Sequence, residues 1–131
     1  MEAENRITVA IVEDNDVYRE ALEIVFGLTS DLAVVVAAPG GRAAVEACGL
    51  AQPDVVLVDY RLPDLDGVET TRALRAECPE TTVLVLTAAA DGAEVEALLE
   101  AGAVECLMKD RELSEIVAAV RAAARRSGVA G

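Results

Sequence analysis

Five short runs rich in β-branched residues alternate with amphipathic stretches along this chain, and this alternation constrains the fold more than any other feature. The runs cover residues 7–12, 34–38, 55–58, 83–86 and 104–108. Each has the length and apolar continuity of a strand that is covered on both faces. The sequence therefore predicts an α/β fold with a doubly wound, five-stranded parallel sheet and five helices.

The first and last of the helical stretches show apolar spacing that predicts one stripe packed on the sheet. These residues are Val17, Ala21, Ile24, Val25 and Leu28 in the first stretch, and Leu113, Ile116, Val117, Val120 and Ala124 in the last. Two other helix starts repeat the pattern Asp-Gly-x-Glu, at residues 66–69 and 91–94. In this pattern the Asp side chain caps free backbone amides at the start of a helix, and the Glu side chain reaches back to the backbone N–H of the Asp. We therefore expect helices to begin directly after Asp66 and Asp91.

Alternating strands and helices imply right-handed crossovers, and five strands favour the flavodoxin-like order 2-1-3-4-5. In this order the first and third strands are neighbours at the point where ligands bind. Polar residues follow four of the five runs: Glu13 and Asp14, Asp59, Thr87, and Lys109. Because parallel strands end at one edge of their sheet, we expect these side chains to form one site.

Three carboxylates close together must either take up a proton or bind a cation. Two like charges about 4 Å apart repel by roughly 4 kcal/mol at an effective dielectric of 20, and a hard divalent ion removes this cost. Mg²⁺ binds through one or two carboxylates while it keeps several waters. We therefore expect Asp14 and Asp59 as direct Mg²⁺ ligands, Glu13 acting through water, and the backbone carbonyl of Arg61 as a further oxygen.

Such a site predicts phosphoryl transfer to a carboxylate. With the metal bound, one oxygen of Asp59 stays free to attack phosphorus in line and form an aspartyl phosphate. Lys109 would then pair with one phosphoryl oxygen, and the Thr87 hydroxyl would hydrogen-bond another. Taken one at a time, the acids are better explained as a helix cap or as solvated strand ends, which is the commoner fate of acidic residues. Their placement at matching strand ends, together with Thr87 and Lys109, favours the functional interpretation.

Composition limits the other functions. A net charge of −13 without histidine opposes direct nucleic-acid binding, which needs a basic face. The three cysteines, Cys48, Cys78 and Cys106, lie far apart and predict reduced core residues. No apolar stretch reaches about 18 residues, and the N-terminus is acidic, so we expect no membrane association and a cytoplasmic location.

We expect one domain at residues 1–126, and a flexible tail or the beginning of a linker at 127–131.

The segments at residues 13–14, 59–67, 86–88 and 107–109 together resemble the receiver domain of two-component response regulators. Pro63 and Gly67, four and eight residues after Asp59, match the loop that follows the phosphorylated residue in that family. Lys109 is followed by Asp110, whereas the family frequently has proline after the lysine. In this respect the chain resembles the NarL-like group of receivers.

This resemblance implies Mg²⁺-dependent phosphorylation of Asp59 by a histidine kinase or phosphotransfer protein, or by a small donor such as acetyl phosphate. It implies self-phosphorylation and autodephosphorylation as the only enzymatic activities. It also implies that phosphorylation switches partner binding, or formation of a homodimer through the region from about Asp91 to Arg126.

Two departures from the family pattern keep alternatives open: Cys106, and the pair Arg61 and Ala89, which lie two residues after Asp59 and Thr87 at places that tune the phosphoryl lifetime in the family. Cys106 stands where most receivers carry Tyr or Phe, so we expect any switch to use Thr87 and residues 88–92 without a ring flip. A phosphorylation-independent pseudoreceiver, acting as a dimerisation or docking module, is therefore the alternative function. A phosphatase of the haloacid-dehalogenase type is disfavoured, because it needs a second acid at the place of Arg61.

Overall fold

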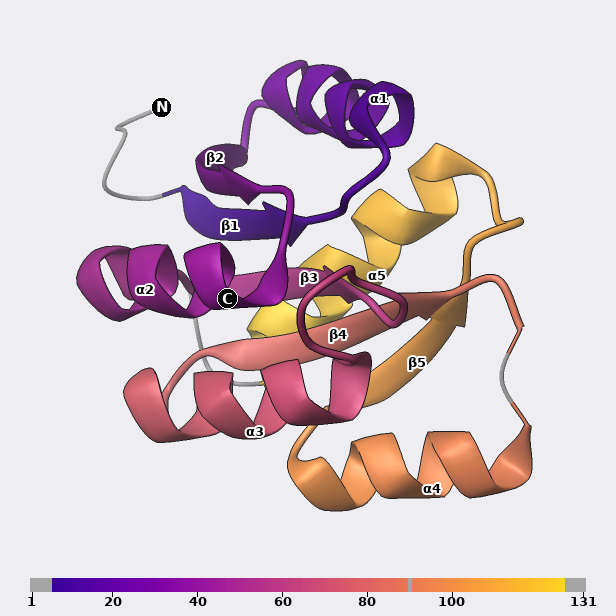
Figure 1. Ribbon diagram of the computed structural model, residues 1–131. Coiled ribbons are helices and arrows are strands. Elements are labelled where there is room, and N and C mark those ends of the chain that lie inside the picture. Colours follow the sequence, from indigo (N-terminus) through magenta and orange to yellow (C-terminus); the bar gives the residue numbers. More distant parts are fainter. Residues whose placement is uncertain (1–5, 90, 127–131) are drawn as a thin grey trace.

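Strands and helices alternate along the whole described chain, as the sequence predicts. The computed structural model describes residues 6–89 and 91–126 (Figure 1); the expected tail at 127–131 lies outside the described residues. The elements are β1 (Ile7–Val12), α1 (Asp16–Gly27), β2 (Leu32–Ala38), α2 (Gly41–Ala51), β3 (Val55–Asp59), α3 (Gly67–Glu77), β4 (Thr82–Thr87), α4 (Gly92–Ala101), β5 (Glu105–Met108) and α5 (Leu113–Arg126).

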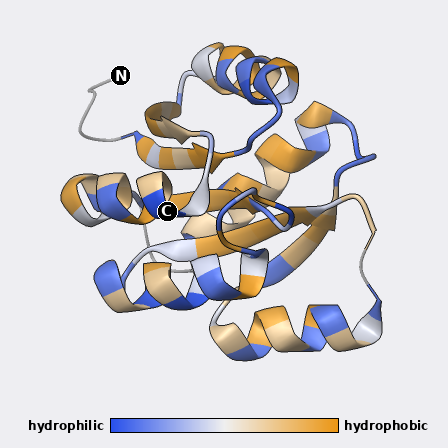
Figure 2. Ribbon diagram, in the orientation of Figure 1, coloured by the Kyte–Doolittle hydropathy of each residue, from blue (hydrophilic) through white to orange (hydrophobic). Residues whose placement is uncertain are grey.

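The five strands are all parallel and lie in the order β2-β1-β3-β4-β5, which confirms the predicted fold class. Helices α1 and α5 cover one face of the sheet, and α2, α3 and α4 cover the other (Figure 1). The three central strands, β1, β3 and β4, are mostly hydrophobic (Figure 2) because both of their faces are buried.

Successive side chains of a strand point to opposite faces, and this alternation divides the core into two layers. In β3, Val55 and Leu57 pack under α1 and α5, whereas Val56 and Val58 pack under α2, α3 and α4. Asp59 follows Leu57 by two residues, so it belongs to the face of α1 and α5.

The predicted stripe of α1 is wrong in part. Val17, Ile24 and Leu28 are 79%, 62% and 82% exposed, and the buried residues of α1 are Leu22 and Phe26. The helix carries apolar residues on more than one side. The side with Leu22 and Phe26 packs on the sheet because these larger side chains bury more apolar area. Val17 and Ile24 of α1, together with Leu28 at its C-cap, consequently form an outward apolar stripe.

The remaining helix predictions are confirmed. The predicted residues of α5 pack on the sheet. Both capping boxes are present: Asp66 and Asp91 each accept the backbone N–H of the Glu three residues on, at 2.8 Å. Within residues 6–89 and 91–126, no helix has the length and apolar character that crossing a membrane requires.

Candidate functional site

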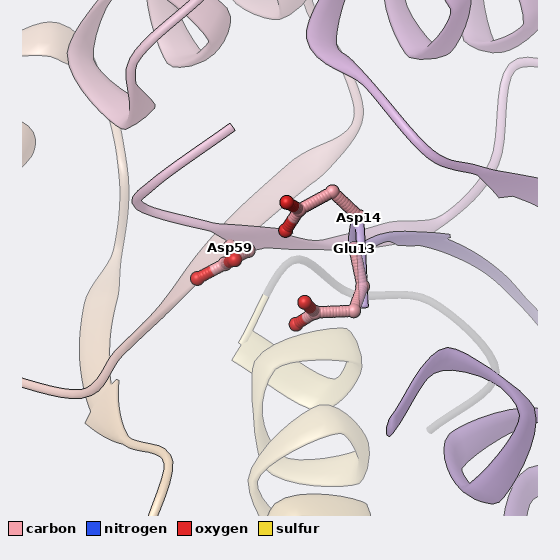
Figure 3. Close-up of side chains that lie close together, drawn as sticks. All are labelled: Glu13, Asp14 and Asp59. Atoms are coloured by element: carbon pink, nitrogen blue, oxygen red, sulfur yellow. The ribbon is translucent and has the colours of Figure 1, made fainter. Parts of the chain in front are cut away.

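Glu13, Asp14 and Asp59 come together at the carboxyl ends of β1 and β3, which are neighbours in the sheet. One carboxylate oxygen from each lies within 4.8 Å of the others, and Figure 3 shows the three side chains grouped beside these strand ends. Glu13 and Asp59 are 1% and 5% exposed, whereas Asp14 is exposed. The predicted cluster of acids therefore exists in the fold.

Lys109 joins this cluster. Its Nζ lies 2.7 Å from Oε1 of Glu13 and 3.7 Å from Oδ2 of Asp59. Burial alone would lower the pKa of Lys109, but the hydrogen bond to Glu13 and the charge of Asp59 outweigh burial and raise it. Lys109 is the only lysine in the sequence, since every other basic residue is arginine.

The alternation of the strands explains why these groups converge. Ile11, Leu57 and Leu107 all belong to the layer under α1 and α5. Glu13, Asp59 and Lys109 each follow one of these residues by two positions, so they are directed to the same face.

Thr87 lies at the same edge but belongs to the opposite face. Val83 and Val85 lie four and two positions before Thr87 in β4, so their side chains point to the same face of the sheet as Thr87. Both pack in the core layer under α2, α3 and α4. The Thr87 hydroxyl donates to the carbonyl of Ala89 at 3.0 Å and accepts the N–H of Ala89 at 3.2 Å. In this structure the Thr87 hydroxyl is therefore hydrogen-bonded within the β4–α4 loop.

The surroundings of Asp59 raise the pKa of its carboxyl group. Burial, and next the negative charge of Glu13, raise its pKa from 3.8 to about 6, although Lys109 and the backbone N–H of Arg61 act in the opposite direction. A group that is this costly to ionise favours a bound cation.

The donor set fits a hard divalent cation. Its three acids offer only oxygen ligands, which Mg²⁺ prefers. Lys109 pairs at 2.7 Å with Glu13 and at 3.7 Å with Asp59, so one ammonium group faces three carboxylates and leaves a surplus of negative charge among them. Arg61 lines the same cleft, together with Asn15, Asp16 and Ala88.

Sequence reasoning missed two residues that hold Glu13. The N–H of Asn15 donates to Oε2 of Glu13 at 3.0 Å, and the guanidinium of Arg19 donates to the Glu13 carbonyl at 2.7 Å. Asn15 is also the N-cap of α1, since its side chain accepts the N–H of Tyr18 at 2.8 Å. An Asn directly before a helical stretch is an N-cap signal that the sequence does contain.

Hydrogen bonds hold the loop after Asp59 at several points. The carbonyl of Tyr60 accepts the N–H of Gly67 at 2.8 Å, and the Tyr60 hydroxyl donates to Glu94 of α4 at 3.1 Å. Asp64 accepts the first two amides of α2, from Gly41 and Arg42, at 2.8 and 3.0 Å. These bonds hold the main chain that carries Asp59.

Gly67 is required by close packing against this loop. A Cβ at this position would lie 2.7 Å from Cδ1 and 3.0 Å from Cα of Tyr60. The second contact involves backbone, so side-chain rotation does not relieve it. We expect Gly67→Ala to lower the free energy of unfolding by about 1–3 kcal/mol, measured by chemical denaturation.

Gly92 provides the matched control, because it also follows a capping Asp at the first position of a helix. Apart from its chain neighbours and the backbone of its own helix, no atom of the described residues lies within 4 Å of a Cβ at Gly92. Gly92→Ala should therefore leave stability unchanged or raise it by up to about 1 kcal/mol. Equal losses in the two variants would contradict the packing argument.

Comparison with known proteins finds similarity to one domain family and to proteins named as transcriptional regulators. A family model described as the response regulator receiver domain matches residues 9–121. Transcriptional regulatory protein LnrK of Bacillus subtilis (strain 168) is 38% identical over 114 residues, which are 87% of this chain and 52% of LnrK. Transcriptional regulatory protein CseB of Streptomyces coelicolor is 41% identical over 123 residues, which are 94% of this chain and 51% of CseB. The chain spans about half the length of these curated relatives.

Solved structures agree with this result. The signal receiver domain of NarL from Mycobacterium tuberculosis has a TM-score of 0.87 and is 35% identical, with 92% of this chain and 97% of that structure covered. The similarity thus includes both the sequence and the arrangement of the whole fold.

Proposed function

This chain belongs to the family of response regulator receiver domains, and we propose that Asp59 is the residue at which it accepts a phosphoryl group. NarL is among its relatives, in agreement with the resemblance of the sequence to the NarL-like group. The family consists of signalling domains, so the chain acts as a phosphoacceptor signalling domain. The histidine kinase or phosphotransfer protein as donor, and the cytoplasmic location, belong to this proposal.

The observation that supports the proposal most strongly is the surroundings of Asp59. Its carboxylate lies at the end of β3, within 4.8 Å of two further carboxylates and 3.7 Å from an ammonium group. An acceptor of a phosphoryl group needs such positive charge at hand, since three charged oxygens arrive with the group.

Each group has a separate role in this proposal. Asp14 and Asp59 would bind Mg²⁺ directly, with the Arg61 carbonyl as a further ligand and Glu13 acting through water. When bound, Mg²⁺ supplies positive charge for the phosphoryl oxygens. Lys109 would pair with one phosphoryl oxygen. The Thr87 hydroxyl would hydrogen-bond a second phosphoryl oxygen only after it leaves the carbonyl of Ala89. This exchange of partners would couple phosphorylation to the β4–α4 loop.

Incubation with acetyl phosphate and Mg²⁺, followed by intact mass measurement, tests the proposal. Phosphorylation adds about 80 Da. We expect this adduct in the wild type and in Asp64→Asn, and no adduct in Asp59→Asn or when EDTA replaces Mg²⁺. An adduct that persists in Asp59→Asn would refute the assignment, and no adduct in the wild type would favour the pseudoreceiver.

The exposed stripe of α1 supports a protein as the phosphoryl donor. Val17 lines a mainly apolar depression beside Lys109 and Ala88, and Ile24 and Leu28 continue the stripe away from the site. An apolar surface that begins at the acceptor site suits a donor protein that must bring a phosphohistidine to Asp59.

Substitution of Ile24 separates docking from chemistry. We expect Ile24→Glu to change stability by less than about 0.5 kcal/mol, because the side chain is exposed. Phosphorylation by acetyl phosphate should be unchanged, whereas transfer from a histidine kinase that phosphorylates the wild type should fall about fivefold or more. Leu50→Glu, at an 86% exposed position of α2, is the control and should leave both rates unchanged.

Dimerisation through the region from Asp91 to Arg126 is part of the same proposal. Leu99, Val104 and Met108 are exposed apolar residues there, at 46%, 47% and 38%. Sizing with and without Mg²⁺ and beryllofluoride, a phosphoryl mimic, measures whether the acceptor site controls association. Direct nucleic-acid binding by this domain is not proposed, because of its net charge of −13.

Cys106 gives a prediction about the switch. This residue is a half-buried free thiol beside the core of α2, α3 and α4, and we propose that switching uses Thr87 and the following loop. Cys106→Ala should therefore change the association constant measured with beryllofluoride by less than about fivefold, or about 1 kcal/mol. Loss of the response in Cys106→Ala, with an unchanged melting temperature, would contradict this route.

A further inference from the structure

Tyr18, in the first turn of α1, lies against the single lysine of the chain. The Nζ atom of Lys109 lies over the Tyr18 ring, 4.6 Å from its centre. A cation within about 6 Å of an aromatic face is attracted by the quadrupole of the ring. The ring is half-buried and packs against the core layer of α1 and α5, so this attraction is only partly screened by water.

The hydroxyl of Tyr18 does not explain this arrangement. It is buried and finds no hydrogen-bond partner among the described residues, and an unpaired buried hydroxyl is unfavourable. Burial raises the pKa of the phenol above its ordinary value, so Tyr18 is uncharged at neutral pH. The ring is therefore the part of Tyr18 that interacts favourably with Lys109.

The position of the ring is set by the residues around Glu13. Asn15 accepts the N–H of Tyr18 and donates its own N–H to Oε2 of Glu13, while Oε1 of Glu13 is paired with Lys109. Tyr18 and Lys109 are thus connected twice, through the ring contact and through Asn15 and Glu13. The connection joins the beginning of α1 to the ends of β1 and β5.

We propose that Tyr18 is a positioning residue whose ring keeps the ammonium group of Lys109 beside Asp59. Lys109 has a long, flexible side chain, and its 2.7 Å contact is with Glu13, whereas Asp59 lies 3.7 Å away. The ring restricts where the ammonium group moves without adding a charge to the site. This inference rests on the proposed function, which gives Lys109 its role toward the phosphoryl group.

A spectroscopic test needs no phosphorylation. Because Lys109 is the only lysine, protein labelled with ¹³C-lysine shows one set of lysine signals. Protons over an aromatic ring are shielded, so the ε-methylene protons of Lys109 should lie upfield of those of free lysine in the wild type and in Tyr18→Phe. In Tyr18→Leu they should return to the position of free lysine.

The kinetic test measures the rate of adduct formation with acetyl phosphate and Mg²⁺. We expect Tyr18→Leu to slow this rate about three- to tenfold, as the usual strength of a cation–ring contact implies. Tyr18→Phe keeps the ring and should restore the wild-type rate. Thermal melting of each variant checks its fold; Tyr18→Met replaces Tyr18→Leu if the latter does not fold.

Three results would overturn the inference: unshifted ε-methylene protons in the wild type, a wild-type rate in Tyr18→Leu, or a Tyr18→Phe rate as low as that of Tyr18→Leu. A wild type that takes up no phosphoryl group at all refutes the proposed function instead. The proton shift then still decides whether Tyr18 positions Lys109.

Discussion

Asp59→Asn is expected to be more stable than the wild type at pH 7.5 without divalent cations, although it loses the phosphoryl adduct completely. The substitution keeps the shape of the side chain and removes a buried charge that lies close to Glu13 and Asp14. The raised pKa of Asp59, about 6, corresponds to a gain of about 1–3 kcal/mol. Chemical denaturation of both proteins measures this difference.

The gain should depend on pH in a defined direction. Because its pKa is higher in the folded than in the unfolded chain, Asp59 binds its proton more tightly in the folded state. Its contribution to stability is therefore fully present below about pH 4 and is lost as pH rises through about 6. The advantage of Asp59→Asn should accordingly vanish near pH 4. Mg²⁺ should also reduce it, because the cation stabilises only the ionised wild type.

Asp64→Asn is the control from the same loop, with the opposite sign. The backbone N–H groups of Arg42 and Gly41 lower the pKa of Asp64, so its contribution is present at neutral pH and is lost as pH falls through this lowered pKa. Asp64→Asn should thus be less stable than the wild type at pH 7.5. An Asp59→Asn variant that is also less stable would mean that the fold depends on the charge of Asp59.

Lys109→Met is expected to lower the free energy of unfolding by roughly 3 kcal/mol at neutral pH. The substitution keeps much of the apolar stem but removes the cationic partner of Glu13, whose side chain is 1% exposed. A buried carboxylate without its cation costs more than the pair itself contributes. Denaturation at pH 7.5 measures the loss.

Two further variants identify the cause. Glu13→Gln introduced into Lys109→Met removes the unpaired charge and should recover most of the lost stability, so that the pair is strongly non-additive. Arg121→Met breaks the ion pair of Arg121 with Asp31, which has a similar N···O distance of 2.8 Å but side chains that are 38% and 36% exposed, respectively. This surface pair should cost less than about 1 kcal/mol. Equal losses for the two ion pairs would exclude burial as the reason.

Local patterns predicted most of the architecture. Strand identity follows from runs of β-branched residues, and two helix starts follow from the capping pattern at Asp66 and Asp91. The carboxylates could be placed at one edge because parallel strands all end at the same side of a sheet. Each of these features depends on neighbouring residues or on a general rule of topology, so the sequence is sufficient for it.

The directions of side chains around the site were decided by packing. The sequence does not show that Thr87 belongs to the sheet face under α2, α3 and α4 while Lys109 belongs to the face under α1 and α5. The face on which each strand residue lies depends on which helices cover that strand in the folded chain. Likewise, the exposure of Ile24 follows from competition between two apolar sides of α1.

The sequence by itself therefore determined the order of elements, the helix caps and the set of chemical groups at the sheet edge. Only the tertiary structure decided that Lys109 pairs with Glu13 at 2.7 Å and that Tyr18 supports it. Residues 18 and 109 lie on separate elements, and their contact exists only once α1 has packed on the sheet beside the end of β5. Local propensities carry no information about such a contact, because it is selected by the burial of the whole core.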